Sequence, residues 1–104
     1  QPITVPEEID HAYWRYLITL DSSINRELLK EELRKDNIAS DWAYYPALHL
    51  QPYFIQQHKT YKGLCPITED VLERNFCLPV NATINQKDSL FVVERFIKAV
   101  QKQL

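Results

Sequence analysis

Three histidines are the side chains of this 104-residue sequence best suited to acid–base or ligand chemistry, because imidazole changes its charge near neutral pH. His11 precedes an aromatic stretch and His58 lies in a polar run, so we expect solvent around both. His49 differs, since it stands between Leu48 and Leu50. A histidine in an apolar setting can donate to a bound anion, act as a base, or be buried against a backbone carbonyl. The spacing leaves these three roles open.

No complete catalytic set accompanies the histidines. Cys65 and Cys77 belong to no C-x-x-C pair, so we expect two buried, reduced thiols rather than a disulfide framework or a metal site. The lysines are expected on polar helix faces and in polar loops, where nothing would lower a pKa for Schiff-base chemistry. Gly63 is the only glycine, which excludes phosphate-cradling loops and a nucleophile elbow. We therefore predict no catalytic residue and no metal ligand in this chain, with a Cys–His pair left open as an alternative.

The composition favours a single packed domain without a charged partner. Hydrophobic residues make up 45% of the chain, and 12 basic residues against 14 acidic ones give a net charge of −2. This balance offers no electrostatic reason to expect nucleic acid or a membrane surface as a partner. No segment has the pattern of a signal peptide or a membrane span, so we expect a cytoplasmic location. The start at Gln1 and the absence of methionine indicate a piece of a longer or processed chain.

The apolar periodicity predicts the elements of the first half. Residues 1–10, which contain two prolines, are expected to form a linker or lead-in. Residues 13–20 alternate as a strand does. The apolar face of this strand is expected to comprise Trp14, Tyr16, Ile18 and Leu20. Asn25 should cap a helix that ends at Asn37, and residues 38–45 should return as a strand.

The middle of the chain is less regular. Residues 47–66 form a long irregular section in which a short helix is expected to start near Pro52. Thr68 should cap the next short helix, at residues 69–74, and residues 76–80 should form a strand.

The last helix is expected to open at Asn85, with Asp88 three residues later. Its buried face should comprise Leu90, Val93, Ile97, Val100 and Leu104. This order of elements predicts an α+β domain, in which a small mixed or antiparallel sheet has helices packed on one face. Five aromatic side chains could stack a base or sugar, or pack at a core or domain interface. They are Trp42, Tyr44, Tyr45, Tyr53 and Phe54.

Residues 45–53, with the sequence YPALHLQPY, resemble the YP-x-LH-LQP-x-Y segment of the DegT/DnrJ/EryC1/StrS family of pyridoxal-phosphate-dependent sugar aminotransferases. Residues 11–16 resemble the H-x-Y-x-x-Y strand of that family, and residues 26–38 resemble its R-x-x-L…L…GI helix and turn. Residues 65–79 resemble its P-x-x-E…LP run. Four motifs in the same order extend the resemblance over nearly the whole chain.

This resemblance implies that residues 11–104 form the C-terminal small domain of a fold-type-I aminotransferase, without the large N-terminal domain that holds pyridoxal phosphate. It implies a homodimeric parent that moves an amino group from glutamate to a nucleotide-linked keto-sugar, in polysaccharide or antibiotic-sugar biosynthesis. The resemblance makes His49 the first candidate for a substrate or cofactor contact, followed by Tyr45 and Gln51 as substrate contacts. The role of His49 would be a hydrogen bond that positions the bound group. We expect the isolated chain to be inactive and to bind no cofactor.

Two other classes of function stay open at this stage. The chain could be a freestanding binding or assembly module that reuses the fold without catalysis. It could also be a small hydrolase that uses His49 with one of the cysteines.

Overall fold

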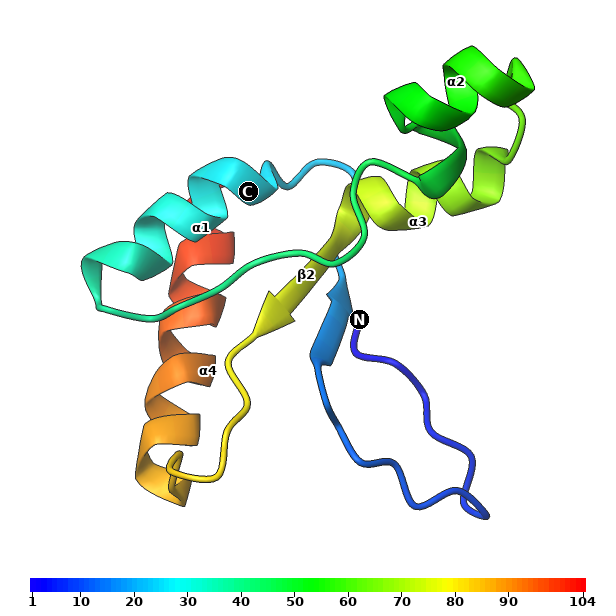
Figure 1. The fold of residues 1–104 in the computed structure, drawn as a ribbon. Coiled ribbons are helices and arrows are strands. Elements are labelled where there is room, and N and C mark those ends of the chain that lie inside the picture. Colours follow the sequence, from blue (N-terminus) through cyan, green and yellow to red (C-terminus); the bar gives the residue numbers. More distant parts are fainter.

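A computed structural model of the protein describes residues 1–104 and has an α+β architecture (Figure 1). In chain order the elements are β1 (Tyr16–Thr19), α1 (Arg26–Lys35), the 3-10 helix η1 (Leu48–Leu50), α2 (Pro52–His58), α3 (Pro66–Arg74), β2 (Asn75–Leu78) and α4 (Gln86–Gln101). The strands β1 and β2 form an antiparallel pair in which Ile18 lies opposite Phe76. The predicted fold class is confirmed.

The hydrophobic core lies between this sheet and the helices α1 and α4, which contact each other. Phe76 of β2 and the α1 residues Leu29 and Leu33 are fully enclosed. Full burial of a side chain of this kind contributes roughly 1.5–3 kcal/mol, so these three are the main anchors of the core. We call β1, β2, α1 and α4 the body. The helices η1, α2 and α3 form an arm that projects from it (Figure 1).

The limits of α1 follow from two asparagines, as predicted. The Asn25 side chain accepts hydrogen bonds from the N–H groups of Glu27 and Leu28, which the first turn leaves without helical partners. Asn37 has a φ of 58°, the left-handed conformation that ends a helix and that asparagine tolerates well. The chain then turns back so that Ile38 N–H donates to the carbonyl of Leu33.

The start of α4 is confirmed, but its predicted buried face is wrong. Asn85 and Asp88 form a reciprocal capping box at the first turn. The residues that face the core are Val92, Phe96, Ala99 and Val100. Of the predicted face only Val100 packs there, and Leu90, for instance, is 63% exposed. The helix carries two adjacent apolar stripes, and the periodicity of one helix cannot choose between them. Contact between the rings of Phe96 and Phe76 fixes the choice.

The first strand is shorter than predicted, and its apolar face is incomplete. Tyr13 has a φ of 46°, which interrupts the extended backbone before β1 begins. Trp14 is consequently 73% exposed rather than part of the core. On the partner strand the ladder ends at Leu78, because the next residue, Pro79, has no N–H to donate.

The predicted return strand at residues 38–45 does not form. Only Asp41 pairs with β2, through two backbone hydrogen bonds to Cys77. At the next antiparallel position the buried side chain of Asn75 replaces the backbone, since its amide accepts from Ala43 N–H at 2.8 Å and donates to Ala43 O at 3.0 Å. Tyr44, with a φ of 57°, then turns the chain away from the sheet.

Three further expectations concern the arm and the lead-in. The short helix predicted from Pro52 is α2 and is confirmed. Thr68 is not a cap, because α3 already starts at Pro66, a residue suited to the first helical position. Within residues 1–10, Pro2 forms a bridge with Ile18 of β1.

Candidate functional site

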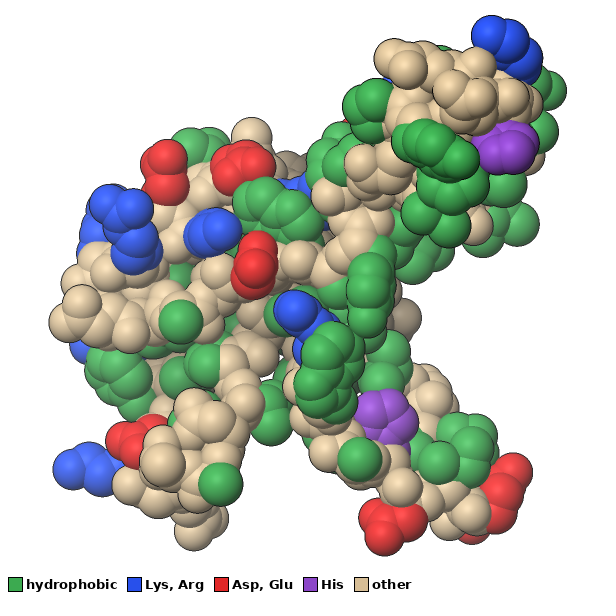
Figure 2. Space-filling view, viewed as in Figure 1, with side chains coloured by type: hydrophobic (Ala, Val, Ile, Leu, Met, Phe, Trp, Pro, Cys, Tyr) green, Lys and Arg blue, Asp and Glu red, His purple; other side chains and the backbone are tan.

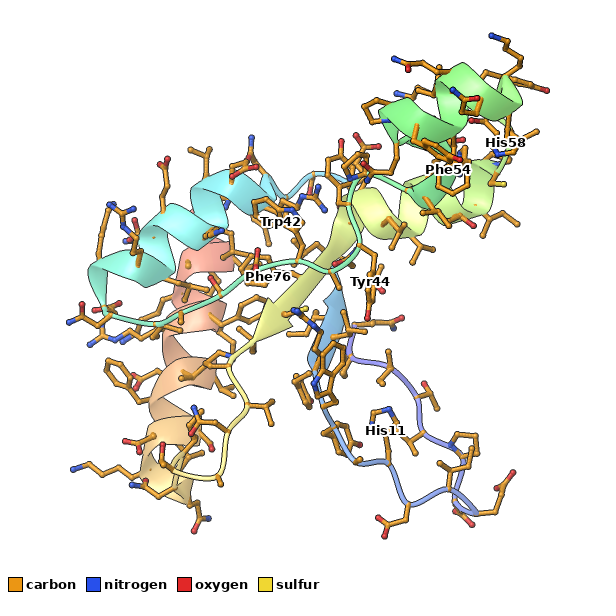
Figure 3. The ribbon with its side chains drawn as sticks, in the orientation of Figure 1. His11, Trp42, Tyr44, Phe54, His58 and Phe76 are labelled. Atoms are coloured by element: carbon orange, nitrogen blue, oxygen red, sulfur yellow. The ribbon has the colours of Figure 1, made fainter.

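The predicted site residues lie on the segment that enters the arm. Tyr45 and Pro46, joined by a cis peptide bond, precede Ala47, whose side chain is buried. The single turn of η1 then presents His49, and Gln51 leads into α2. The connection that carries this segment leaves the body near Tyr44 and reaches the arm, where Phe54 and His58 lie (Figure 3).

His49 is held by an acidic residue that lies 20 positions later in the chain. Its Nε2 lies 2.8 Å from Oε1 of Glu69 on α3, and the two side chains are only 12% and 11% exposed. An ionised carboxylate can only accept, so His49 donates the Nε2 proton. In the neutral imidazole this leaves Nδ1 as an acceptor, and no group within the chain donates to it.

Glu69 joins three segments of the arm. Its two carboxylate oxygens accept from Gly63 N–H at 2.8 and 3.0 Å, and Oε1 also accepts from Cys65 N–H at 3.3 Å. The hydrogen bond from His49, followed by those backbone donors, holds the pKa of Glu69 below its ordinary 4.5, although partial burial acts in the opposite sense. The hydroxyl of Thr60 donates to the His49 carbonyl at 2.6 Å and closes the loop from the other side. We call His49, Glu69 and Thr60, with the amides of Gly63 and Cys65, the clasp.

Tyr45 packs where the arm meets the body. The guanidinium carbon of Arg26 lies 4.2 Å from the centre of its ring and 4.5 Å from that of Trp42. Arg26 also donates to the carbonyl of Leu72 at the end of α3. A cation between two aromatic faces is a favourable arrangement, so Arg26 fixes the orientation of both rings while Tyr45 stays half exposed.

Gln51 has a local role in the structure. Its side-chain amide donates to the carbonyl of Pro46 at 3.1 Å and its backbone N–H donates to Leu48 O. Both bonds stabilise the turn that presents His49, and the side-chain oxygen of Gln51 has no partner within the chain.

The other histidines lie apart from this site. His11 accepts from Tyr13 N–H in the lead-in, and His58 packs beside Phe54 at the end of α2 (Figure 3). Cys77 is buried and Cys65 is half-buried, both as free thiols, and neither makes a hydrogen bond to a histidine. The Cys–His alternative therefore has no geometric support.

Potential metal ligands do not cluster in this structure, and its lysines lie at or near the surface. Nowhere in the chain do three side chains of histidine, cysteine, aspartate or glutamate gather closely enough to hold a metal ion. Six of the seven lysines are exposed, and the half-buried Lys30 contacts Asp41 and the ring of Trp42. No lysine is thus in the desolvated setting that a Schiff base with this cofactor requires. No helix combines the length and apolarity needed to cross a membrane.

Glu69 is the site residue that reasoning from residue types missed. The P-x-x-E spacing contained it, but nothing in the sequence alone joins that carboxylate to His49. Only the contact between η1 and α3 in the arm brings the two together.

The fold and this segment define a class of protein. The model of the DegT/DnrJ/EryC1/StrS aminotransferase family matches residues 1–97. The chain therefore belongs to this family. It is 34% identical over 102 residues to the uncharacterized protein MJ1066 of Methanocaldococcus jannaschii. This match covers 95% of this chain and 26% of that protein.

A solved structure has the same fold. Spr1654 from Streptococcus pneumoniae, assigned as a sugar aminotransferase and solved in its PMP form, superimposes with a TM-score of 0.79 at 22% identity. The match covers 99% of this chain and 26% of that one. The chain thus spans about a quarter of the length of the proteins it matches.

Proposed function

We propose that this chain is the C-terminal small domain of a pyridoxal-phosphate-dependent aminotransferase that moves an amino group from glutamate to a nucleotide-linked keto-sugar. One observation carries the proposal: the chain belongs to an aminotransferase family, yet none of its seven lysines is buried. The remaining three quarters of a relative's length leave room for a domain that does. The chain by itself is then inactive and binds no cofactor.

The exposed apolar surface supports a large partner domain. Only 12 of 104 residues are buried, which is few for a domain that stands alone. Large apolar side chains gather on the arm (Figure 2), where Leu48 and Ile67 are among the exposed ones. A second exposed row on α4 includes Leu90 and Ile97. Patches of this kind mark interaction surfaces, and we assign them to the N-terminal domain and to the second subunit of a homodimer.

His49, Tyr45 and Gln51 are proposed as substrate contacts. The contact with Glu69 occupies Nε2 of His49, and Nδ1 of the neutral imidazole can accept a hydrogen bond from a substrate hydroxyl. The half-exposed ring of Tyr45, which Arg26 holds, offers a flat surface to a sugar or base. Pyridoxal phosphate, held outside this chain, would supply the electron sink for the transfer. The residues of this chain orient the substrate against it. The same proposal places the parent in the cytoplasm, in polysaccharide or antibiotic-sugar biosynthesis.

The test uses the full-length gene product, assayed with glutamate and a set of nucleotide-linked keto-sugars. We expect a lysine-dependent visible absorbance with pyridoxal phosphate in the full-length protein and none in residues 1–104. His49→Ala should lower the activity and leave the cofactor bound, whereas Thr68→Ala, on the solvent-exposed first turn of α3, should change neither.

Two results would contradict the proposal. A gene that encodes this chain alone, with no cofactor-binding domain, would favour the freestanding binding module. Loss of cofactor from the His49→Ala variant would move His49 from the substrate to the cofactor.

A further inference from the structure

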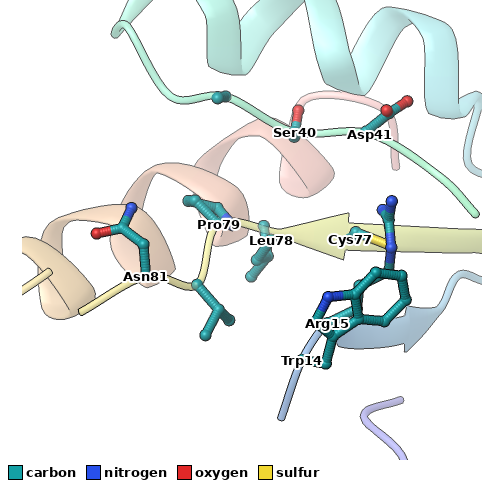
Figure 4. A pocket seen from close by; sticks show the side chains of 10 residues that line it. Trp14, Arg15, Ser40, Asp41, Cys77, Leu78, Pro79 and Asn81 are labelled. Atoms are coloured by element: carbon teal, nitrogen blue, oxygen red, sulfur yellow. The ribbon is translucent and has the colours of Figure 1, made fainter. Parts of the chain in front are cut away.

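A cavity of about 400 Å³ lies on the body, apart from the clasp. It is bounded by the residues that lead into β1, by the end of β2 and the turn after it, and by the loop at residues 39–41 (Figure 4). None of Tyr45, His49 and Gln51 lines it. The Arg15 guanidinium extends past the Sγ of Cys77 toward Ser40 and Asp41 (Figure 4).

Arg15 has far more hydrogen-bond donors than the chain uses. A guanidinium carries five N–H donors. The chain occupies one of them, through a contact of 3.8 Å from Nη1 to the Cys77 sulfur, which is a weak acceptor. Its Nε is buried without a partner, and no ion pair joins Arg15 to an acidic residue. Because an enclosed donor without a partner is costly, this arrangement calls for an acceptor from outside the chain.

Two more donors line the same cavity. The hydroxyl of Ser40 is buried and has no partner. The oxygen of the Asn81 side chain accepts from Thr83, which leaves its NH₂ group free to donate. Donor groups from three separate segments thus line the cavity, with Asn81 at the opposite end from Arg15 (Figure 4).

The charge around the cavity is positive. Asp41 is its only acidic wall residue, and Lys30 lies 3.5 Å from that carboxylate. Lys30 lies outside the cavity wall and balances the charge of Asp41, which leaves the charge of Arg15 without a counter-charge. The cavity is therefore suited to an anion.

One wall is flat and apolar. The ring of Trp14 lies 4.9 Å from the guanidinium carbon of Arg15 and is largely exposed. Leu78 and Pro79 continue this surface. A ring on the ligand could stack on Trp14 while its charged group reached Arg15.

We propose that Arg15 and Ser40 form a binding site for the carboxylate or phosphate group of a small molecule, whose flat part lies against Trp14. Arginine is suited to this role because its fork of N–H groups matches the oxygens of either group. The site does not depend on whether the parent is an aminotransferase.

The test is a titration of the full-length gene product, labelled with ¹⁵N-arginine, with phenyl phosphate and separately with benzoate. The two probes share a ring and differ in the anionic group, so the probe that binds more tightly shows whether the site prefers a phosphate or a carboxylate. We expect a saturable shift of the Arg15 Nε–H signal, which is assigned by its loss in Arg15→Lys. Arg15→Ala should weaken binding by about ten- to hundredfold, the effect of losing a charge-assisted hydrogen bond.

Arg34→Ala is the matched control, since Arg34 is an exposed arginine of α1 outside the cavity and its loss changes the net charge equally. The affinity of the Arg34→Ala variant for either probe should equal that of the unmodified protein. If the Arg15→Ala variant unfolds at a lower temperature than the unmodified protein, the Arg15→Gln variant takes its place and should also weaken binding. Absence of a saturable shift with either probe, or an equal loss in Arg34→Ala, would overturn the proposal. The first result would mean that Arg15 is paired with another part of the full-length protein.

Discussion

The body and the arm of this molecule are stabilised by different means. In the body, eight buried apolar residues form one cluster between the sheet and two helices. In the arm, η1, α2 and α3 contain no buried residue at all, and the clasp of His49 and Glu69 takes the place of a core. The difference indicates that the body folds around its own interior. The arm keeps its shape through directed polar contacts and leaves its apolar side chains free for another surface.

The strongest test of this comparison is the removal of a core ring. Phe76→Ala should lower the free energy of unfolding by about 3–5 kcal/mol, because Phe76 is fully enclosed and leaves a cavity. Chemical denaturation of the 104-residue chain measures this loss. Ile67→Ala, which truncates an exposed apolar side chain of the arm, should change it by less than about 0.5 kcal/mol. Equal losses from the two variants would show that the arm has a core of its own.

A second test concerns the polar contact inside the body. Asn75→Ala removes two hydrogen bonds to Ala43 and one to the carbonyl of Leu72, and leaves the Ala43 groups enclosed. We expect a loss of about 1–3 kcal/mol, together with faster hydrogen exchange at Ala43 N–H. Gln57→Ala, on the exposed surface of α2, serves as the control and should leave that exchange unchanged.

A smaller effect should follow from loss of a helix cap. Asn25→Ala leaves the N–H groups of Glu27 and Leu28 without their acceptor and should cost about 1 kcal/mol. The helical signal in circular dichroism should decrease at the start of the thermal transition. A variant as stable as the parent would show that packing of Leu29 and Leu33 alone determines α1.

The smallest effect is confined to the arm and depends on pH. The pKa of Glu69 is lower in the folded chain than its ordinary 4.5, so the ionised carboxylate stabilises the arm above that pH. This stabilisation is lost as the pH falls through the folded pKa. The Gly63 amide signal should therefore titrate with a midpoint below 4.5, and His49→Gln should raise that midpoint. A midpoint at or above 4.5 in the unmodified chain would show that ionised Glu69 does not stabilise the arm.

Local chemistry explains which parts of the fold the sequence predicts well. The caps at Asn25 and Asn85 and the left-handed Asn37 act on neighbouring backbone groups, so each is visible within a few residues. The family motifs also led to the right fold class, which the comparisons confirm.

Contacts between distant segments explain the failures. The buried stripe of α4 depends on where Phe76 lies, and the missing strand at residues 38–45 depends on one side chain, Asn75, that replaces the backbone partner. The pairing of His49 with Glu69 likewise requires the arm to close. The role of His49, Tyr45 and Gln51 toward a substrate stays a prediction.

The two apolar stripes of α4 have a practical consequence for anyone who handles this chain in solution. One side of α4 carries a row of exposed apolar side chains, Leu90, Val93 and Ile97, while its other side is packed against the core. A net charge of −2 gives little electrostatic repulsion between molecules. The free chain should therefore self-associate as its concentration rises. Replacing these three residues with glutamate, glutamine and lysine would give a monodisperse version with its interior intact.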